Sequence, residues 1–320
     1  MLVLRLLPLL PLTRSLFTVG PGRLALANHL LPVFYSSAAQ VIRIPPGFDP
    51  SLDSSLPSDR PPALFLPGLD GQGIYAIPAL TNLSRSHDLY KLNVPPDDRS
   101  TFLQVADLVT EALTRFKTPA VLIGDSCGAL IACFVAARSP RLVSNLVLIN
   151  PATSFDRTAW SLLAPMVVNT GPAYNLLGPL VFTAGMVEPE QAIRIGGAAL
   201  RGLVRAADPG AYLNDLLALV GDFVGLLPPA TVRWRVSRWL EVGNRLMTSR
   251  YKQITVPTLL LLGKVDKMLP SEAEGFLLEK RLSNAAVEVR EFETRGHMLL
   301  DDKYLMRSKL HVLTTILDLT

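Results

Sequence analysis

The chain has 320 residues, of which 49% are hydrophobic and 18% are charged, and its formal net charge is +4. This length allows one large core with a sizeable insertion, and the apolar content excludes a disordered protein. The net charge is too small for a chain of this size to indicate nucleic-acid binding. Cys127 and Cys133 are the two cysteines and lie in one predicted helix, so neither a disulfide nor a metal site is expected.

The first 48 residues have the composition of an organelle transit peptide followed by a linker. No acidic residue precedes Asp49, and arginine, serine and threonine are spread along the segment. This composition is typical of import into a plastid or a mitochondrion. The apolar run at 2–12 is alternatively a secretory signal segment, although Arg5 and two prolines interrupt it, and it is too short to span a bilayer. Cleavage is expected either before about residue 38, ahead of a short strand at 40–44, or near Asp49.

Apolar strands alternate with amphipathic helices from residue 63 onward. We expect strands at 63–66, 89–94, 120–123, 146–149, 258–262 and 287–292. Helices are expected at 74–83, 101–116, 128–137, 271–281 and 304–317, with capping boxes of Thr101 with Gln104 and of Ser271 with Glu274. The alternation predicts an α/β fold over residues 49–320, with a mostly parallel doubly wound sheet and helices on both faces.

The segment from about 156 to 254 contains no predicted strand. A connection of this length must have structure of its own. Its apolar stretches predict a helical cap over the carboxyl edge of the sheet, with a pocket for a long hydrocarbon chain. The uncharged stretch 160–187 is alternatively a membrane span, but 169–172 and 178–179 interrupt it, so we expect a cap that is compatible with shallow membrane contact. The arginines of this segment indicate either solvated helix faces or a basic entrance for a phosphate-bearing acyl donor.

A G-x-S-x-G motif lies between the predicted strand 120–123 and the helix that follows it. The serine of this motif occupies a tight turn, and the flanking Gly124 and Gly128 allow the strand and the helix to pack closely. We therefore predict that Ser126 is a nucleophile. The neighbouring Asp125 is expected to be a structural hydrogen-bonding residue.

An oxyanion hole is expected beside this serine. The glycine-rich segment 66–73 follows the strand at 63–66, where a G-x-S-x-G hydrolase contributes one backbone N–H to the developing oxyanion. The predicted donors are the N–H groups of Leu69 and of Cys127, the residue after the nucleophile.

The order of the remaining candidates along the chain predicts the base and the acid. His297 lies in the loop between the last strand and the last helix, and Asp266 follows the strand at 258–262. The order Ser…Asp…His makes His297 the general base and Asp266 the acid that fixes its tautomer. The other histidines and the rival acids are His29, His87, His311, Asp156, Asp301 and Asp302.

Three motifs together resemble a known family: Leu-Pro-Gly-Leu-Asp-Gly-Gln-Gly at 66–73, Gly-Asp-Ser-Cys-Gly at 124–128 and Asn-Pro-Ala-Thr-Ser-Phe at 150–155. Over roughly 63–297 the chain looks like the plastid esterase/lipase/thioesterase family that includes the phytyl ester synthases. The resemblance implies an α/β-hydrolase fold, a plastid location, and transfer of fatty acyl groups to phytol or diacylglycerol. Plant members of the family continue into an acyltransferase-like domain with a His-x4-Asp motif, which is not seen here in a suitable place, so a hydrolase-only relative and a shortened chain both fit.

The sequence thus predicts a serine acyl hydrolase or acyltransferase that needs no cofactor and acts on long-chain acyl esters or thioesters. The intact set of Ser126, Asp266 and His297 favours an enzyme. Two alternatives stay open: a non-catalytic lipid-binding protein that keeps the fold, and an esterase of a small non-lipid ester.

Overall fold

The computed structural model describes residues 38–45, 59–186 and 224–300, together with a few positions between 197 and 210. The predicted transit peptide up to residue 37 and the predicted helix at 304–317 lie outside the described residues.

Seven strands form one sheet in the order β1-β3-β2-β4-β5-β6-β7. They are β1 (Gln40–Arg43), β2 (Pro62–Leu66), β3 (Asp88–Asn93), β4 (Ala120–Asp125), β5 (Val143–Ile149), β6 (Thr258–Gly263) and β7 (Val287–Phe292). Only β1 pairs antiparallel, with β3, and the other five pairs are parallel. Every residue of β2, β4 and β6 is buried, as expected for parallel strands covered on both faces. The predicted mostly parallel α/β sheet is confirmed.

Alternate residues of the central strands enter two separate cores. On one face, leucines such as Leu64 and Leu122 pack against α4 (Phe102–Thr114), α5 (Cys127–Arg138) and α12 (Ser271–Arg281). On the other face, Phe65 and Ile123 pack against α3 (Ile77–Ser86). The short 3-10 turn η3 (Ile74–Ala76) leads into α3, so the helix expected at 74–83 begins as a 3-10 turn.

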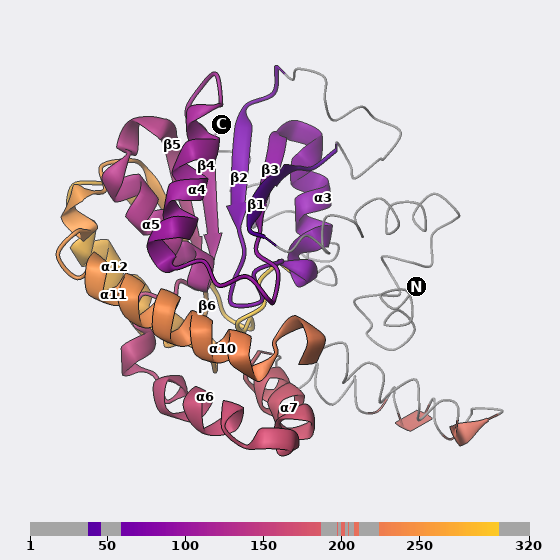
Figure 1. Ribbon diagram of the computed structural model, residues 1–320. Coiled ribbons are helices and arrows are strands. Elements are labelled where there is room, and N and C mark those ends of the chain that lie inside the picture. The colour runs from indigo at the N-terminus through magenta and orange to yellow at the C-terminus, as the bar shows by residue number, and fades with distance from the viewer. Residues whose placement is uncertain are drawn as a thin grey trace.

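The described part of the connection between β5 and β6 contains helices and short turns and no strand. It contains η5 (Phe155–Arg157), α6 (Trp160–Val168), η6 (Gly171–Ala173), α7 (Tyr174–Met186), α10 (Pro229–Arg235), the π-helical η7 (Val236–Leu240), α11 (Glu241–Met247) and η8 (Tyr251–Gln253). Figure 1 shows α6, α7 and α10 beyond the carboxyl ends of β4 and β5. The uncharged stretch is thus divided into two helices, and no described helix has both the length and the apolarity that a bilayer crossing requires.

One of the two predicted capping boxes is present. Thr101 caps α4, and its hydroxyl and backbone N–H form the reciprocal hydrogen bonds with Gln104. The box predicted at Ser271 and Glu274 is wrong, because Pro270 is the N-cap of α12 and makes no side-chain cap. The Ser271 hydroxyl instead donates to Asp266, and the Glu274 carboxylate accepts from Thr153.

Candidate active site

Ser126 occupies a strained turn between β4 and α5. Its φ is +52°, a left-handed value that costs a side chain of this size on the order of 1–3 kcal/mol. The turn is possible because the neighbouring glycines leave no Cβ in the way. A Cβ at Gly128 would lie 2.2 Å from the carbonyl oxygen of Leu66, and one at Gly124 would lie 2.5 Å from Cα of Ala129. The Ser126 N–H donates to the carbonyl of Ile149 at 2.8 Å, which ties the turn to β5.

Three of the predicted site residues form one hydrogen-bonded chain. Nε2 of His297 lies 3.1 Å from Oγ of Ser126, and Nδ1 of His297 lies 2.9 Å from Oδ2 of Asp266. The three residues come from the end of β4, the loop after β6 and the loop after β7. This is the arrangement in which an imidazole takes a proton from a serine while a carboxylate holds its other nitrogen.

The Asp266 carboxylate is fixed by donors on both oxygens. Oδ1 accepts from the N–H groups of Met268 at 2.8 Å and Leu269 at 3.1 Å, and Oδ2 accepts from Oγ of Ser271 at 2.6 Å as well as facing His297. Its side chain is 1% exposed. The carboxylate therefore keeps one orientation toward the imidazole.

Burial and charge act in opposite directions on this pair. Burial favours the neutral form of Asp266, but the His297 ring and the hydrogen bonds to the carboxylate outweigh it and hold the pKa of Asp266 below its usual range. Burial likewise favours neutral His297, but the adjacent Asp266 carboxylate outweighs it and raises the pKa of His297 above 6.5.

The loop expected to hold the oxyanion lies directly against the serine. A Cβ at Gly68 would be 3.4 Å from Cβ of Ser126, which is van der Waals contact, so the backbone of the loop passes directly beside the serine. Among the described residues the N–H of Leu69 donates to no partner. Cys127 is the first residue of α5, and such an N–H has no partner within its own helix. Both predicted donors are thus available to a ligand.

Arg235 holds this loop from the far side. The guanidinium comes from the last residue of α10 and donates to the carbonyls of Leu69 at 2.7 Å, Val94 at 2.8 Å and Pro95 at 2.8 Å. It also lies over the ring of Trp239, 5.0 Å from the ring centroid. A Cβ at Gly71 would be 2.7 Å from Nη1 of this arginine, so the loop can close on the guanidinium only because residue 71 is glycine.

The charge of Arg235 has no carboxylate partner in the described part of the chain. The residue is fully buried, and burial lowers the pKa of Arg235 to about 10, which leaves it protonated at neutral pH. Backbone carbonyl dipoles and an aromatic ring contact the guanidinium directly, and the charges of Asp70 and Asp98 favour its protonated form from further away. This role could not be predicted from the sequence, because Arg235 looks like any other arginine of the segment 156–254.

Asn150 opens one of the three motifs, but no role was predicted for its side chain. It directly follows β5 with a φ of +39°, a value that asparagine tolerates better than most residues. Its Nδ2 donates to the carbonyls of Gly296 at 3.0 Å and His297 at 2.9 Å, and its Oδ1 accepts from the N–H of Gly263 at 2.8 Å. One buried amide thus positions both the histidine loop and the start of the acid loop.

Asp125 and Tyr75 form a further hydrogen-bonded pair beside Ser126. The Tyr75 hydroxyl donates to Oδ2 of Asp125, while Oδ1 of Asp125 has no partner among the described residues. Burial raises the pKa of Asp125 to about 7, against the opposing effects of His297 and the tyrosine hydrogen bond. The Asp125 side chain therefore accepts a structural hydrogen bond, in the role predicted for it.

Of the rival residues, His87 lies away from the hydrogen-bonded chain of Ser126, His297 and Asp266. His87 precedes β3 at the amino edge of the sheet, opposite the edge that carries Ser126. His29, His311, Asp301 and Asp302 lie outside the described residues, and Asp156 is part of η5. In the described part of the chain no three His, Cys, Asp or Glu side chains are grouped as metal ligands.

No family model matches the chain. Phytyl ester synthase 1, chloroplastic, of Arabidopsis thaliana is 30% identical over 283 residues, which are 83% of this chain and 39% of that protein. Phytyl ester synthase 2, chloroplastic, of the same plant is 26% identical over 278 residues, 81% of this chain and 38% of that protein. The chain therefore spans about two fifths of the length of these curated relatives.

Solved structures share the fold at low identity. A candidate lipase, lip1, of Acinetobacter baumannii AYE is 18% identical with a TM-score of 0.60, covering 94% of this chain and 97% of that chain. The enol-lactonase of Burkholderia xenovorans LB400 is 15% identical with a TM-score of 0.59, covering 88% and 95%.

The parallel sheet, the turn at Ser126 and these structural neighbours place the chain in the class of proteins with the α/β-hydrolase fold. Within that class it is a homologue of the phytyl ester synthases, and the resemblance read from the three motifs is confirmed.

The raised pKa of His297 predicts the pH dependence of the serine. Only neutral His297 can accept the Ser126 proton, so the rate of labelling by a fluorophosphonate should fall as the pH drops, with a midpoint above pH 6.5. Asp266→Asn removes the charge that raises this pKa, so its midpoint should move to lower pH while the plateau rate falls by about 10³- to 10⁴-fold. An unchanged midpoint in Asp266→Asn would contradict the coupling of these two residues.

Replacing Arg235 should disorder the oxyanion loop. Arg235→Met leaves three buried carbonyls without a donor, so we expect a loss of about 2–4 kcal/mol in the free energy of unfolding and a fall in kcat of at least about tenfold with a smaller change in KM. Arg235→Lys should retain part of both the free energy of unfolding and kcat. The matched control is Arg238→Met, three residues further on and exposed, with its guanidinium over Trp234. Thermal unfolding and ester hydrolysis measure the two effects, and a folded Arg235→Met with wild-type kcat would refute the positioning role.

Proposed function

We propose that the protein is a plastid serine acyl hydrolase or acyltransferase that acts on long-chain acyl esters or thioesters, with Ser126 as nucleophile, His297 as base and Asp266 as acid. The observation that carries this proposal is the continuous hydrogen-bonded chain from Oγ of Ser126 through His297 to Asp266. The names of the Arabidopsis relatives, both phytyl ester synthases and both chloroplastic, support the lipid substrate and the plastid location.

The chemistry begins with attack of Oγ of Ser126 on the acyl carbonyl carbon, while Nε2 of His297 accepts the hydroxyl proton. The N–H groups of Leu69 and Cys127 stabilise the oxyanion, and Asp266 stabilises the imidazolium. The tetrahedral intermediate collapses, the bond to the leaving alcohol or thiol breaks, and His297 returns the proton to that group. Water or an acceptor alcohol such as phytol then attacks the acyl-enzyme in the reverse sequence, which releases a free acid or a new ester.

The segment 156–254 is proposed to be the cap that supplies the acyl pocket. Nε1 of Trp160 in α6 donates to the carbonyl of Lys267 at 3.0 Å, immediately after Asp266, and the Trp160 ring stacks on Phe182 of α7 at 5.7 Å between centroids. A Cβ at Gly185 of α7 would lie 2.3 Å from Sδ of Met268. Apolar side chains of the cap therefore pack directly on the acid loop, and they reduce the access of water to it.

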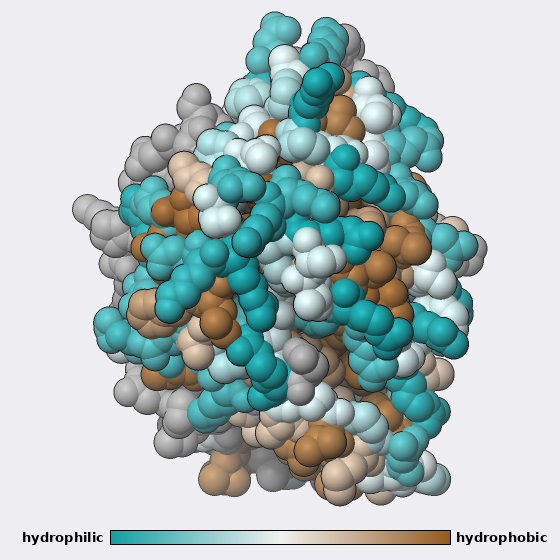
Figure 2. Space-filling view, turned by 90° about the vertical axis from the view of Figure 1, so that its left-hand side faces the viewer, coloured by the Kyte–Doolittle hydropathy of each residue, from teal (hydrophilic) through white to brown (hydrophobic). Residues whose placement is uncertain are grey.

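Peripheral contact with a lipid surface is the second part of the proposal. The pair of helices α6 and α7 carries no charge between residues 158 and 187 and exposes large apolar side chains, namely Leu162, Leu163, Met166, Leu177 and Leu180. Figure 2 shows apolar residues at the lower end of the molecule, where α6 and α7 lie. Exposed apolar helix faces next to a site for lipid esters favour shallow burial in a membrane interface.

Labelling with a fluorophosphonate probe tests the nucleophile. The wild-type chain should be labelled, long-chain acyl esters should compete, and Ser126→Ala should lose labelling and at least about a thousandfold of its esterase rate. Ser237→Ala, at an exposed serine whose hydroxyl donates to the carbonyl of Arg233, is the matched control. Supplying an acyl donor with phytol then separates transfer from hydrolysis by the product formed, either phytyl ester or free fatty acid alone. No labelling of the folded wild type would overturn the proposal in favour of a lipid-binding protein.

Co-sedimentation with phosphatidylcholine–phosphatidylglycerol vesicles tests the membrane contact. Replacing Leu162, Met166 and Leu180 by serine should reduce the partition coefficient by at least about tenfold, because each contributes apolar surface to the lipid. Leu103→Ser is the control, since Leu103 is 44% exposed but lies on α4. Equal binding of the triple variant and the wild type would rule out this face.

A further inference from the structure

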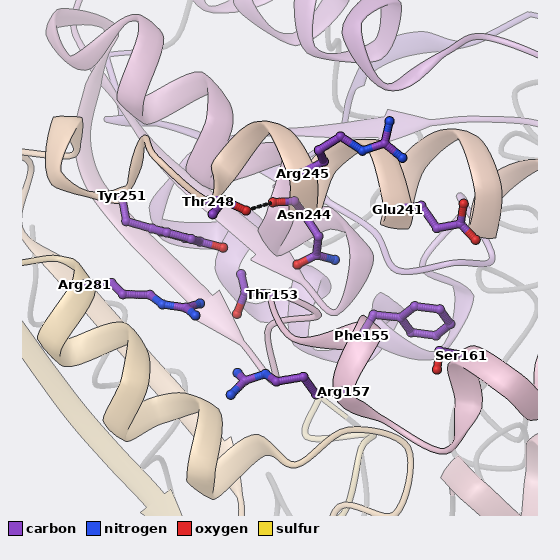
Figure 3. Close-up of a pocket in the computed structure, with 10 residues that line it drawn as sticks. All are labelled: Thr153, Phe155, Arg157, Ser161, Glu241, Asn244, Arg245, Thr248, Tyr251 and Arg281. Atoms are coloured by element: carbon purple, nitrogen blue, oxygen red, sulfur yellow. Dashed lines mark hydrogen bonds between the residues drawn. The ribbon is translucent and has the colours of Figure 1, made fainter.

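A cavity of about 550 Å³ lies beside α11, α12 and the loop that follows β5. Ser126, His297 and Asp266 are not among the residues that line it. Figure 3 shows its lining, in which Arg157, Arg281 and Tyr251 all extend toward Thr153. The three residues come from η5, α12 and η8, so separate segments direct polar groups to one region.

The cavity has a surplus of positive charge near Thr153. Glu274 lies beneath it with a fully buried side chain, and its carboxylate accepts hydrogen bonds from Oγ1 of Thr153 and Nη2 of Arg157. Nη1 of Arg281 lies 3.7 Å from the same carboxylate. Two guanidiniums thus share one carboxylate, which leaves a net positive charge. Their side chains are 45% and 41% exposed, so further N–H donors of both are accessible from the cavity.

The Tyr251 hydroxyl lacks a well-aligned acceptor. The residue is 3% exposed, and among the described residues its hydroxyl oxygen has no partner with good hydrogen-bond geometry. Thr153 is its polar neighbour: its hydroxyl donates to Glu274, and its oxygen is at best a weak acceptor for Tyr251. Burial raises the pKa of Tyr251 well above its usual value, so the hydroxyl keeps its proton at neutral pH. A buried donor of this kind favours an acceptor that enters from the cavity.

We propose that this cavity is a binding site for a small organic oxyanion, a molecule that carries a phosphate or carboxylate group. The guanidiniums of Arg157 and Arg281 would hold the anionic oxygens, and the Tyr251 hydroxyl would donate to one of them. The volume of the cavity leaves room for the organic part of the ligand.

The site is separate from Ser126 but connected to it by a short path. The N–H of Ala152 donates to the carbonyl of Ser126 at 3.0 Å, and Nδ2 of Asn244, in the wall of the cavity, donates to the carbonyl of Ala152 at 3.2 Å. Thr153 is the next residue along the chain. An anion that orders Thr153 and Arg157 therefore stabilises the segment that contacts the nucleophile.

Thermal unfolding of the full chain at constant ionic strength tests the site, with sodium phosphate and sodium citrate each compared with sodium chloride. We expect a saturable rise in Tm with at least one of the two anions, and the anion that gives it identifies the group recognised. Arg281→Gln should weaken the apparent affinity by at least about tenfold, and Tyr251→Phe by about fivefold. Arg238→Gln, at an arginine exposed on η7, is the matched control and should respond as the wild type does.

Tyr251→Phe distinguishes binding from folding. The change removes a hydroxyl that makes no hydrogen bond in the described structure, so the Tm without anion should not fall while the response to anion weakens. Ser126→Ala should keep the full response, which separates this site from the proposed catalysis. A wild type that responds to phosphate and citrate no more than to chloride, or a full response in both Arg281→Gln and Tyr251→Phe, would overturn the proposal.

Discussion

The left-handed turn at Ser126 is the constraint on which the rest of the site depends. A residue with a positive φ between a buried strand and a buried helix is held only if its surroundings leave no alternative. Here a carbonyl of β5 accepts a hydrogen bond from the Ser126 N–H, and the N–H of Ala152 donates to the Ser126 carbonyl. The neighbouring glycines allow α5 to pack against the end of β2. The hydroxyl is thereby placed at the carboxyl edge of the sheet, where the loops after β2, β6 and β7 meet.

Two carboxylates near this turn show how charged neighbours, donors and burial together set protonation. Asp266 faces His297, receives hydrogen bonds from two backbone N–H groups and from Ser271, and has a lowered pKa. Asp125 is more deeply buried and receives one hydrogen bond, from Tyr75, and its pKa rises to about 7. The fold therefore supports a charged acid next to the imidazole and a much weaker one behind the serine.

Most of the fold was predictable from the sequence, because strands covered on both faces and G-x-S-x-G turns depend on local pattern. Ser126, Asp266 and His297 were predictable too, because the fold fixes the order of these three residues along the sequence. The wrong capping box at Ser271 has a physical reason: the helix begins one residue earlier than the box requires, with Pro270 as its N-cap, and the Ser271 hydroxyl donates to the Asp266 carboxylate, a strong acceptor. The positioning roles of Asn150 and Arg235 could not be predicted in this way, because their partners are backbone carbonyls of residues far away in the sequence. Every residue has a backbone carbonyl, so such a partner leaves no pattern in the sequence.

The contact of Arg235 with Leu69 also adds a late step to the assembly of the site. The two residues are separated by 166 positions, and the arginine belongs to the segment between β5 and β6. During synthesis the chain from β2 to α5 emerges first, with the serine motif complete, but the Leu69 carbonyl beside it still lacks the guanidinium that ties it to the carbonyls of Val94 and Pro95. Asp266 and His297 emerge later still. A nascent or partly unfolded chain therefore carries Ser126 without its hydrogen-bonded partners and without a fixed neighbouring loop.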